Sequence, residues 1–305
     1  MGKLVVSLSP HAHGTDSVEK NMYGVIVALL PALLVSFYFF GIGSVIVCAT
    51  SVIACILFEW AISKYILKQN RCTVCDGSAA LTGLLLGMNL PSNLPIWMII
   101  VGALIAIGVG KMSFGGLGQN PFNPAQLMSY TDATTGATPL SIMQRAIKGE
   151  DVIDQLPTAL DLFLGNNLGT IGEVSALALL IGLAYMLWRK IITWHIPVSI
   201  IGTVLVFATI LWLCDDRMYA DPLQVIFSGG LMLGAIFMAT DYVTSPMCAK
   251  GQIIYGISIG VLTVVIRNWG AYPEGMSFAI LIMNAFTPLI NMYIKPKRFG
   301  EVAKK

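Results

Sequence analysis

The chain alternates between long apolar runs and short polar segments. The apolar runs cover 21–40, 42–66, 78–91, 95–111, 169–188, 195–214, 223–240, 251–267 and 275–294. Most approach the ~20 residues that a helix needs to cross about 30 Å of hydrocarbon. The run 78–91 is shorter, rich in glycine, and closes with the sequence PSNLP. This pattern predicts an all-α, polytopic membrane protein in which some helices are broken.

Composition supports the same class. Of 305 residues, 56% are hydrophobic and 11% are charged, with a mean hydropathy of +0.78. Soluble domains carry about 25% charged residues. The formal net charge is +2 and no dense basic block occurs, so nucleic acid is not an expected partner, whereas membrane lipid is. The cysteines are scattered, mostly within apolar runs, and are expected to be small buried hydrophobes rather than a disulfide framework.

Positive charges at the ends of the runs predict the orientation, because cytoplasmic loops are enriched in lysine and arginine. These residues are Lys3, Lys20, Lys64, Lys68, Arg71, Lys111, Arg189, Lys190, Lys250, Lys295, Lys297, Arg298, Lys304 and Lys305. All of them can share one side of the membrane. The chain is therefore expected to be a multi-pass protein of the cell (inner) membrane with both termini in the cytoplasm.

This orientation requires one more crossing between Lys111 and the run 169–188. The segment 113–135 must supply it, and its beginning, SFGGLGQNPFNPA, is too rich in glycine and proline for a lipid-facing helix. Broken backbone is tolerated at membrane depth only where protein buries it or where it lines a cavity. The prediction is about ten crossings with an irregular fifth. The alternative is nine spans with Lys111 or Arg189 on the opposite side.

Ten crossings divide into two sets of five. The segments 76–87 (DGSAALTGLLLG) and 228–235 (SGGLMLGA) open the third and eighth crossings and run in opposite directions, as in an inverted repeat. The alternative is that small residues only allow close helix packing. The expected organisation is a cytoplasmic arm 1–20, a first membrane repeat 21–135, an extracytoplasmic loop 136–168, a second membrane repeat 169–294 and a cytoplasmic tail 295–305.

The segment 134–140 (TTGATPL) is rich in hydroxyls and small residues, unlike most of the chain. Attachment of a cofactor through a phosphoester needs a hydroxyl group in a segment that a modifying enzyme can reach. Gly136 and Ala137 would give access to Thr138, and Pro139 would fix the backbone just beyond it. Asp132 could organise the loop through side-chain to backbone hydrogen bonds. On spacing alone, an ordinary turn is the commoner explanation, because these residue types are frequent in loops.

Longer motifs occur in a recognisable order along nearly the whole chain. They are SPH at 9–11, DGSAALTGLLL at 76–86, FGGLGQNPFNPA at 114–125, GATPL at 136–140, WHIP at 194–197, GAIFMATD at 234–241 and IRNWGAYPEG at 266–275. On these motifs the chain resembles the RnfD/NqrB family, membrane subunits of ion-translocating electron-transport complexes. So many motifs in one order make the resemblance specific.

The resemblance implies a flavin site. The family carries FMN in a phosphodiester bond to the last threonine of an (S/T)GAT motif, which is Thr138 here, with Gly136 and Ala137 preceding it. A flavin transferase that uses FAD as donor makes this bond. A noncovalent riboflavin is a further expected cofactor. The loop 136–168 would then carry the flavin near the outer face.

The resemblance also implies an activity and partners. The chain would be a subunit of a translocase, a ferredoxin:NAD⁺ oxidoreductase that transports Na⁺ or H⁺, and would not be catalytic alone. Its partners would be the other subunits of an Rnf-type complex, including a second flavoprotein.

One feature departs from the family: the segment 123–130 (NPAQLMSY) leads almost directly into Thr131. The fifth crossing is therefore expected to be abbreviated.

Carboxylates beside apolar runs are candidates for an ion pathway. Asp76 begins a glycine-rich run, and Asp241 follows another, with Thr244 close behind. A carboxylate in the bilayer is costly, and hydroxyls and carboxylates at broken helix ends suit the coordination of Na⁺ or the relay of H⁺. Glu59 is a further candidate. The alternative is that these groups cap helices at the interface and contact water.

Other motifs predict little chemistry. The CTVC sequence at 72–75 is a lone CxxC, and structural zinc or cluster sites usually need four ligands, so no metal site is expected. No phosphate-binding loop is present, so the chain itself is not expected to bind NAD or ATP. The alternative function is a stand-alone secondary transporter or channel. That class also uses inverted repeats and broken helices, but it has no use for a flavin loop.

Overall fold

The computed structural model describes residues 17–68, 74–125, 138–150, 152–165, 169–270 and 272–295. Within these segments every regular element is a helix, and no strand occurs. The predicted all-α fold is confirmed to that extent. Residues 126–137, which include part of the predicted fifth crossing, lie outside the described residues.

The α-helices vary widely in length. They are α1 (Val18–Phe40), α2 (Ile42–Ala61), α3 (Ser78–Met88), α4 (Ile96–Leu104), α5 (Pro139–Ile147), α6 (Ala159–Leu164), α7 (Ala176–Trp188), α8 (His195–Cys214), α9 (Pro222–Phe227), α10 (Leu231–Leu233), α11 (Ala249–Trp269) and α12 (Met276–Tyr293). Three are extended by π-helical turns, which are η1 (Ile62–Ile66), η3 (Ile105–Val109) and η8 (Gly234–Met238). The 3₁₀ turns are η2 (Val74–Asp76), η4 (Met112–Phe114), η6 (Ile153–Gln155) and η7 (Ile171–Glu173).

Six helical segments among the described residues are long and apolar enough to cross a membrane. They are Val18–Phe40, Ile42–Ile66, Ile96–Phe114, His195–Cys214, Ala249–Trp269 and Met276–Tyr293. Two further helices, α3 and α7, are apolar but shorter. The chain is therefore an integral membrane protein. The count of ten crossings stays a prediction.

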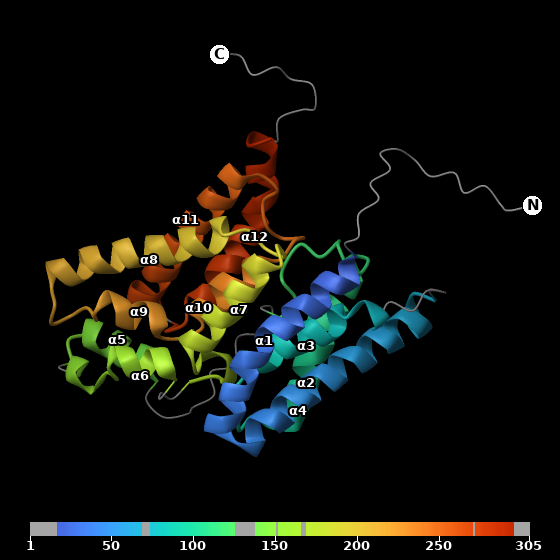
Figure 1. Cartoon of the computed structure of the whole chain (residues 1–305), viewed down its shortest axis with the longest axis horizontal. Helices are drawn as coiled ribbons and strands as arrows, with labels where there is room; N and C mark the ends of the chain where they lie inside the picture. The colour runs from blue at the N-terminus through green and yellow to red at the C-terminus, as the bar shows by residue number, and fades with distance from the viewer. Residues whose placement is uncertain are drawn as a thin grey trace, which may run out of the picture.

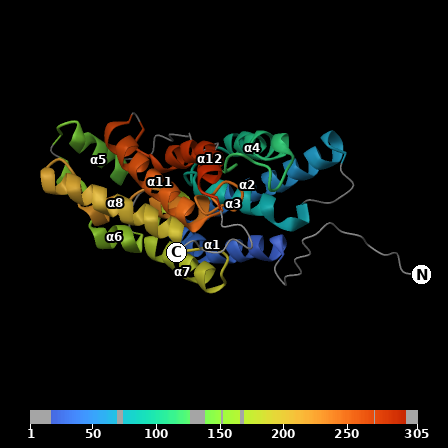
Figure 2. The same cartoon turned by 90° about the horizontal axis from the view of Figure 1, so that it is seen from above.

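The helices form two groups that meet at α1 and α7 (Figures 1 and 2). In the first group α2 packs against both α3 and α4. In the second group α8 packs against α11 and α9, and α12 packs against α11. The contact between α1 and α7 joins the groups. At the far end of the second group, the short helix α6 packs against α9, and α5 packs against α11 (Figure 1).

Local chemistry explains where the first two helices begin and end. The Ser17 hydroxyl oxygen accepts a hydrogen bond from the Lys20 N–H at 3.2 Å, which caps an otherwise unpaired amide of α1. Gly41 separates α1 from α2 with a φ of 64°, a conformation that glycine adopts without steric cost. The chain therefore reverses direction in a single residue between two long apolar helices.

Small residues bring α2 and α3 into close contact. A Cβ at Gly83 would lie 2.7 Å from the Cα of Val52, so only glycine fits there. The Ser51 hydroxyl donates to the Gly83 carbonyl at 2.7 Å across this contact. Membrane helices associate through such backbone approach and through hydroxyl hydrogen bonds, because apolar burial gives little net driving force in lipid.

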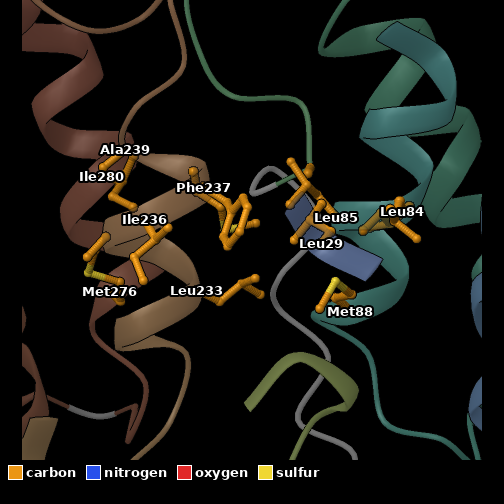
Figure 3. Packing of buried hydrophobic residues seen from close by; sticks show 14 of the residues in the cluster. Leu29, Leu84, Leu85, Met88, Leu233, Ile236, Phe237, Ala239, Met276 and Ile280 are labelled. Carbon is orange, nitrogen blue, oxygen red and sulfur yellow. The ribbon is translucent and has the colours of Figure 1, made fainter. Parts of the chain in front are cut away.

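The buried core between the groups is built around the broken segment α10–η8. Leu233 and Phe237 of this segment point toward Leu29 of α1 and Leu85 of α3, while Met276 of α12 lies behind it (Figure 3). All five side chains are at most 5% exposed. The segment α10–η8 spans only 231–238 and is preceded by Gly229, whose φ is 66°. The middle of the protein is therefore filled by short helical pieces rather than by a continuous helix.

Candidate functional sites

Thr138 is the N-cap of the nine-residue helix α5, and Gly136 and Ala137 lie outside the described residues. Its Oγ1 accepts a hydrogen bond from the Ser141 N–H at 3.4 Å, and the Ser141 hydroxyl donates to the Thr138 carbonyl at 2.8 Å. Pro139 occupies the first helical position, where a missing N–H has no cost. The half-buried Thr138 hydroxyl thus lies at the positive end of the α5 dipole.

The helix α5 is amphipathic and is held against the second group. Leu140, Ile142 and Ala146 are buried, while Arg145 pairs with Glu150 on the exposed side at 2.5 Å. The Gln144 side-chain amide donates to the Gly270 carbonyl at 3.1 Å, just beyond the end of α11. Thr138 is therefore attached to a helix with a fixed position.

A small pocket of about 30 Å³ lies between α5, α8, α9 and α11; we call it the α5 cleft. Its walls are mainly apolar and include Leu140 and Met143 of α5, Leu211 of α8 and Val264 of α11. Arg267, near the end of α11, contributes the cationic group of the lining. The cleft adjoins the helix that Thr138 begins.

Arg267 is 6% exposed and is fixed by three contacts. Its guanidinium donates to the Val225 carbonyl at 2.9 Å and to the Ser228 carbonyl at 3.2 Å, and it lies 3.5 Å from a Glu274 carboxylate oxygen. Its Nε is buried and has no hydrogen-bond partner in the part of the chain that the structure describes. A buried donor without a partner is costly, so this atom requires an explanation.

A second cavity of about 80 Å³ lies between the two helix groups; we call it the central cavity. Residues from both groups line it, among them Ser78, Lys111, Asn123, Phe237 and Asp241. It reaches the beginning of α3 and the end of η8, so it lies where two broken segments meet.

A buried network of charged and polar groups lies beside the central cavity. Lys111 Nζ lies 2.6 Å from Glu59 Oε2, and these side chains are 3% and 1% exposed. Lys111 Nζ also donates to Ser78 Oγ at 2.5 Å, and that hydroxyl donates to Asp76 Oδ1 at 2.5 Å. Asp76 additionally accepts from the Ser78 N–H at 2.8 Å, at the first residue of α3. Asp76 is therefore linked to the cavity through Ser78.

The sequence pattern does not identify Lys111 as a member of this network. The pattern indicates that Lys111 lies at the cytoplasmic surface of the membrane, whereas in the structure its side chain is buried. A signal is nevertheless present, because Lys111 is isolated between a long apolar run and a glycine-rich segment. Arg189 and Lys190, which also predict the orientation, are by contrast adjacent basic residues.

Asp241 also lines the central cavity and lies in the loop after η8. It accepts a hydrogen bond from the Thr244 hydroxyl at 3.3 Å, and Thr244 is only 2% exposed. Burial raises the pKa of the Asp241 carboxyl above its usual range, while hydrogen bonds from Val243 and Thr244 lower it. Asn123 fixes the adjacent loop by donating to the Met238 carbonyl at 3.2 Å. The predicted residues Asp241 and Thr244 are thus brought together, while Thr138 belongs to a different part of the fold.

These features define an integral membrane protein whose interrupted helices enclose a central cavity lined with ionisable and amide groups. The chain belongs to the NQR2, RnfD, RnfE family, which it matches over residues 5–300. The resemblance inferred from the sequence motifs is therefore confirmed.

Three relatives illustrate the similarity. The chain is 44% identical to the D subunit of the Na(+)-translocating ferredoxin:NAD(+) oxidoreductase complex of Acetobacterium woodii, over 97% of this chain and 95% of that protein. It is 41% identical to the D subunit of the proton-translocating ferredoxin:NAD(+) oxidoreductase complex of Clostridium ljungdahlii, over 97% and 96%. It is 33% identical to the D subunit of the ion-translocating oxidoreductase complex of Erwinia tasmaniensis, over 97% and 98%.

Proposed function

We propose that this chain is the flavin-carrying membrane subunit of a ferredoxin:NAD⁺ oxidoreductase complex that translocates Na⁺ or H⁺, and that it passes electrons through FMN bound covalently to Thr138. Full-length similarity to one and the same subunit of such complexes supports the assignment to a complex. The observation that carries the flavin assignment is the position of the Thr138 hydroxyl at the N-cap of α5.

The N-cap position suits a phosphodiester. The linkage carries one negative charge, and a helix N-terminus stabilises an adjacent anion by about 0.3–1 kcal/mol. Phosphorylation of Oγ1 leaves an ester oxygen at the position that now faces the Ser141 N–H. The FMN supplies the redox chemistry, while the chain holds and orients it. Gly136 and Ala137 would give the flavin transferase access to the hydroxyl.

The central cavity is the proposed place for the ion path or for a noncovalent riboflavin. Asp76, Asp241, Thr244 and Glu59 remain the proposed ion-pathway residues, and we add Lys111, which pairs with Glu59. Carboxylate and hydroxyl oxygens are suitable ligands for a hard cation and suitable proton carriers.

The proposed topology has ten crossings in two inverted repeats with both termini in the cytoplasm. Corresponding helices have corresponding neighbours, since α2 packs on α3 and α4 much as α8 packs on α9 and α11. A buried cation also lies at the start of each short central helix. Lys111 donates to Ser78 Oγ at the first residue of α3, and Arg267 donates to the Ser228 carbonyl just before α10.

The proposed partners are the other subunits of the complex, including a second flavoprotein that exchanges electrons with the FMN. The coupled ion is not specified by similarity. One relative named as Na⁺-translocating and one named as proton-translocating are 44% and 41% identical to this chain. The ion must therefore be measured on this protein.

A gel assay tests the covalent flavin. The chain is co-expressed with a flavin transferase, denatured in SDS and viewed under ultraviolet light, with Thr138→Ala and Ser141→Ala beside it. We expect a fluorescent wild-type band, no fluorescence for Thr138→Ala, and retained fluorescence for Ser141→Ala, since Ser141 offers its amide rather than its side chain to Oγ1. A dark wild-type band, with the transferase active on another substrate, would reject the proposal.

A stand-alone transporter or channel is the second candidate, because interrupted helices beside a polar cavity also occur in that class. A chain that remains colourless after co-expression, yet moves Na⁺ or H⁺ across liposomes without partner subunits, would establish this alternative.

A further inference from the structure

An open groove lies between α8 and α11; we call it the α8–α11 groove. Its volume is about 550 Å³, within the roughly 300–1,000 Å³ that ligand sites have. Its walls are exposed apolar side chains at helical spacing, which are Val198, Val206, Ile210, Ile253, Ile257 and Val261. From His195 to Ile210 the groove follows α8 for about 22 Å. That is more than half of the ~30 Å hydrocarbon thickness, so the groove is long enough for a lipid acyl chain.

Gly202 gives the groove its depth, because a Cβ at this position would meet nothing within 4 Å. The two helices touch at other positions. A Cβ at Gly260 of α11 would lie 2.8 Å from Thr203 Cβ of α8, and Gly256 similarly lies against Ile196. Since 256 faces 196 and 260 faces 203, α8 and α11 run in the same direction. Both helices therefore begin at the same end of the groove.

This end of the groove is electrostatically positive. Each helix N-terminus carries a partial positive charge. Arg189 and Lys190 are exposed in the loop that leads into α8. Lys250 is the exposed second residue of α11, and it shares a face with Ile253 and Ile257, three and seven residues further on. A cation at a helix N-terminus is unfavourable unless an anion lies near it, so the groove has an end that suits an anionic group.

The distribution of acidic residues gives the groove a direction. The segments 189–195 and 245–253 contain no aspartate or glutamate. At the opposite end, Asp215 and Asp216 are exposed directly after α8 and would repel an anion. The Thr193 hydroxyl donates to Gln252 Oε1 at 2.9 Å, which joins the two helix starts at the positive end. An anionic headgroup is therefore favoured at one end only.

His195 adds a polar atom without a partner at this end. It is the first residue of α8 and lines the groove. Its Nδ1 is buried and has no hydrogen-bond partner among the described residues. A ring nitrogen of histidine can donate to a phosphate oxygen. Trp194 stacks on the His195 ring with 4.4 Å between centroids, and tryptophan is enriched at the level of lipid headgroups.

We infer that the α8–α11 groove binds an anionic phospholipid, with an acyl chain along the groove and the headgroup at the end where α8 and α11 begin. A transmembrane helix of a partner would cover the apolar walls, but it would leave the positive end without an anion. The site is separate from Thr138, so the inference does not rest on the proposed flavin.

The first test compares two lipids that differ only in headgroup charge. The full chain is purified in a non-ionic detergent, and phosphatidylglycerol or phosphatidylcholine with the same acyl chains is added. A ligand that binds the folded state raises the unfolding temperature. Phosphatidylglycerol should raise it more than phosphatidylcholine does, and mass spectrometry of the intact protein should find one retained phosphatidylglycerol. Equal effects of the two lipids would overturn the inference.

The second test locates the lipid. Lys250→Gln should weaken phosphatidylglycerol binding about fivefold, the effect of one basic residue near an anionic lipid. Lys64→Gln, which removes an exposed lysine at the end of another long helix, should bind like wild type. Gly202→Trp fills the groove and should lose the retained lipid, while Ile100→Trp on the exposed side of α4 should keep it.

Lipid retained equally by Gly202→Trp and Ile100→Trp would place it outside the groove and overturn the inference. If Gly202→Trp does not accumulate, Val206→Trp on the same wall replaces it, and the lysine pair still decides the position of the headgroup. These outcomes are independent of flavin fluorescence, so failure here leaves the proposed function unchanged.

Discussion

At the residue scale, Lys111 and Glu59 show how strongly the interior of this protein depends on paired charges. Both side chains are almost fully buried, and their charged atoms lie 2.6 Å apart. An unpaired charge in such a place has a large desolvation cost, whereas a pair with good geometry largely offsets it. The Ser78 hydroxyl provides a further contact to the ammonium group.

The losses of stability from removing each member of this pair should therefore not be additive. We expect Lys111→Met or Glu59→Gln to lower the free energy of unfolding by about 3–5 kcal/mol, and the double variant to lose less than the sum of the two. Thermal unfolding of the purified chain in detergent measures this. In the exposed control, Arg145→Gln should change stability by less than about 1 kcal/mol. Additive losses at Lys111 and Glu59 would contradict the coupling.

The sequence predicts some site residues and not others for a physical reason. Thr138 lies in a short motif, so its candidate role could be predicted from the neighbouring residues in the sequence. Arg267 is one residue of a longer motif. It donates to the Val225 and Ser228 carbonyls and lines the pocket beside α5, and all of these partners are distant in the chain. Contacts of this kind follow from tertiary packing, which local pattern does not encode.

At the scale of single elements, the close contact of α2 and α3 limits the size of the side chains that α3 can have at the contact. Gly83→Ala would place a Cβ 2.7 Å from backbone of α2, which cannot move aside as a flexible side chain can. We expect a loss of about 1–3 kcal/mol in unfolding free energy from overpacking.

Gly202 in α8 provides the matched control, since a Cβ there would meet nothing within 4 Å. Gly202→Ala should be neutral or should stabilise the helix by about 0.5–1 kcal/mol, because alanine is the better helix former. Melting curves of the two variants compare them directly. Equal losses at both positions would mean that helix propensity, not the approach of α2 and α3, governs the effect.

Element lengths were predictable where an apolar run is continuous and less so where glycines interrupt it. The runs 21–40 and 195–214 correspond closely to α1 and α8. The run 223–240 is instead divided into α9, α10 and η8, because Ser228 and Gly229 break the helix. Hydropathy reports burial in an apolar medium, and it does not distinguish one long helix from several short ones packed inside protein.

At the scale of the whole molecule, the arrangement of the crossings can be tested without reference to any cofactor. In a background lacking the other cysteines, Ser141→Cys and Thr193→Cys should react with a membrane-impermeant thiol reagent from opposite sides. Ser141 should label in intact cells and Thr193 only in inverted vesicles, since Thr193 follows Arg189 and Lys190. Labelling of Ser141→Cys only in inverted vesicles, from the cytoplasmic side, would reject the ten-crossing topology.

The short helices at the centre also determine where a membrane voltage acts. The helix α3 has 11 residues and so is about 16 Å long, roughly half of the ~30 Å hydrocarbon thickness. The segment α10–η8, residues 231–238, is shorter still, and residues of α3 and η8 line the central cavity. Moving one elementary charge through 100 mV involves about 2.3 kcal/mol. Where such short helices separate the two aqueous sides, that electrical work would be spread over roughly half the length of a full crossing.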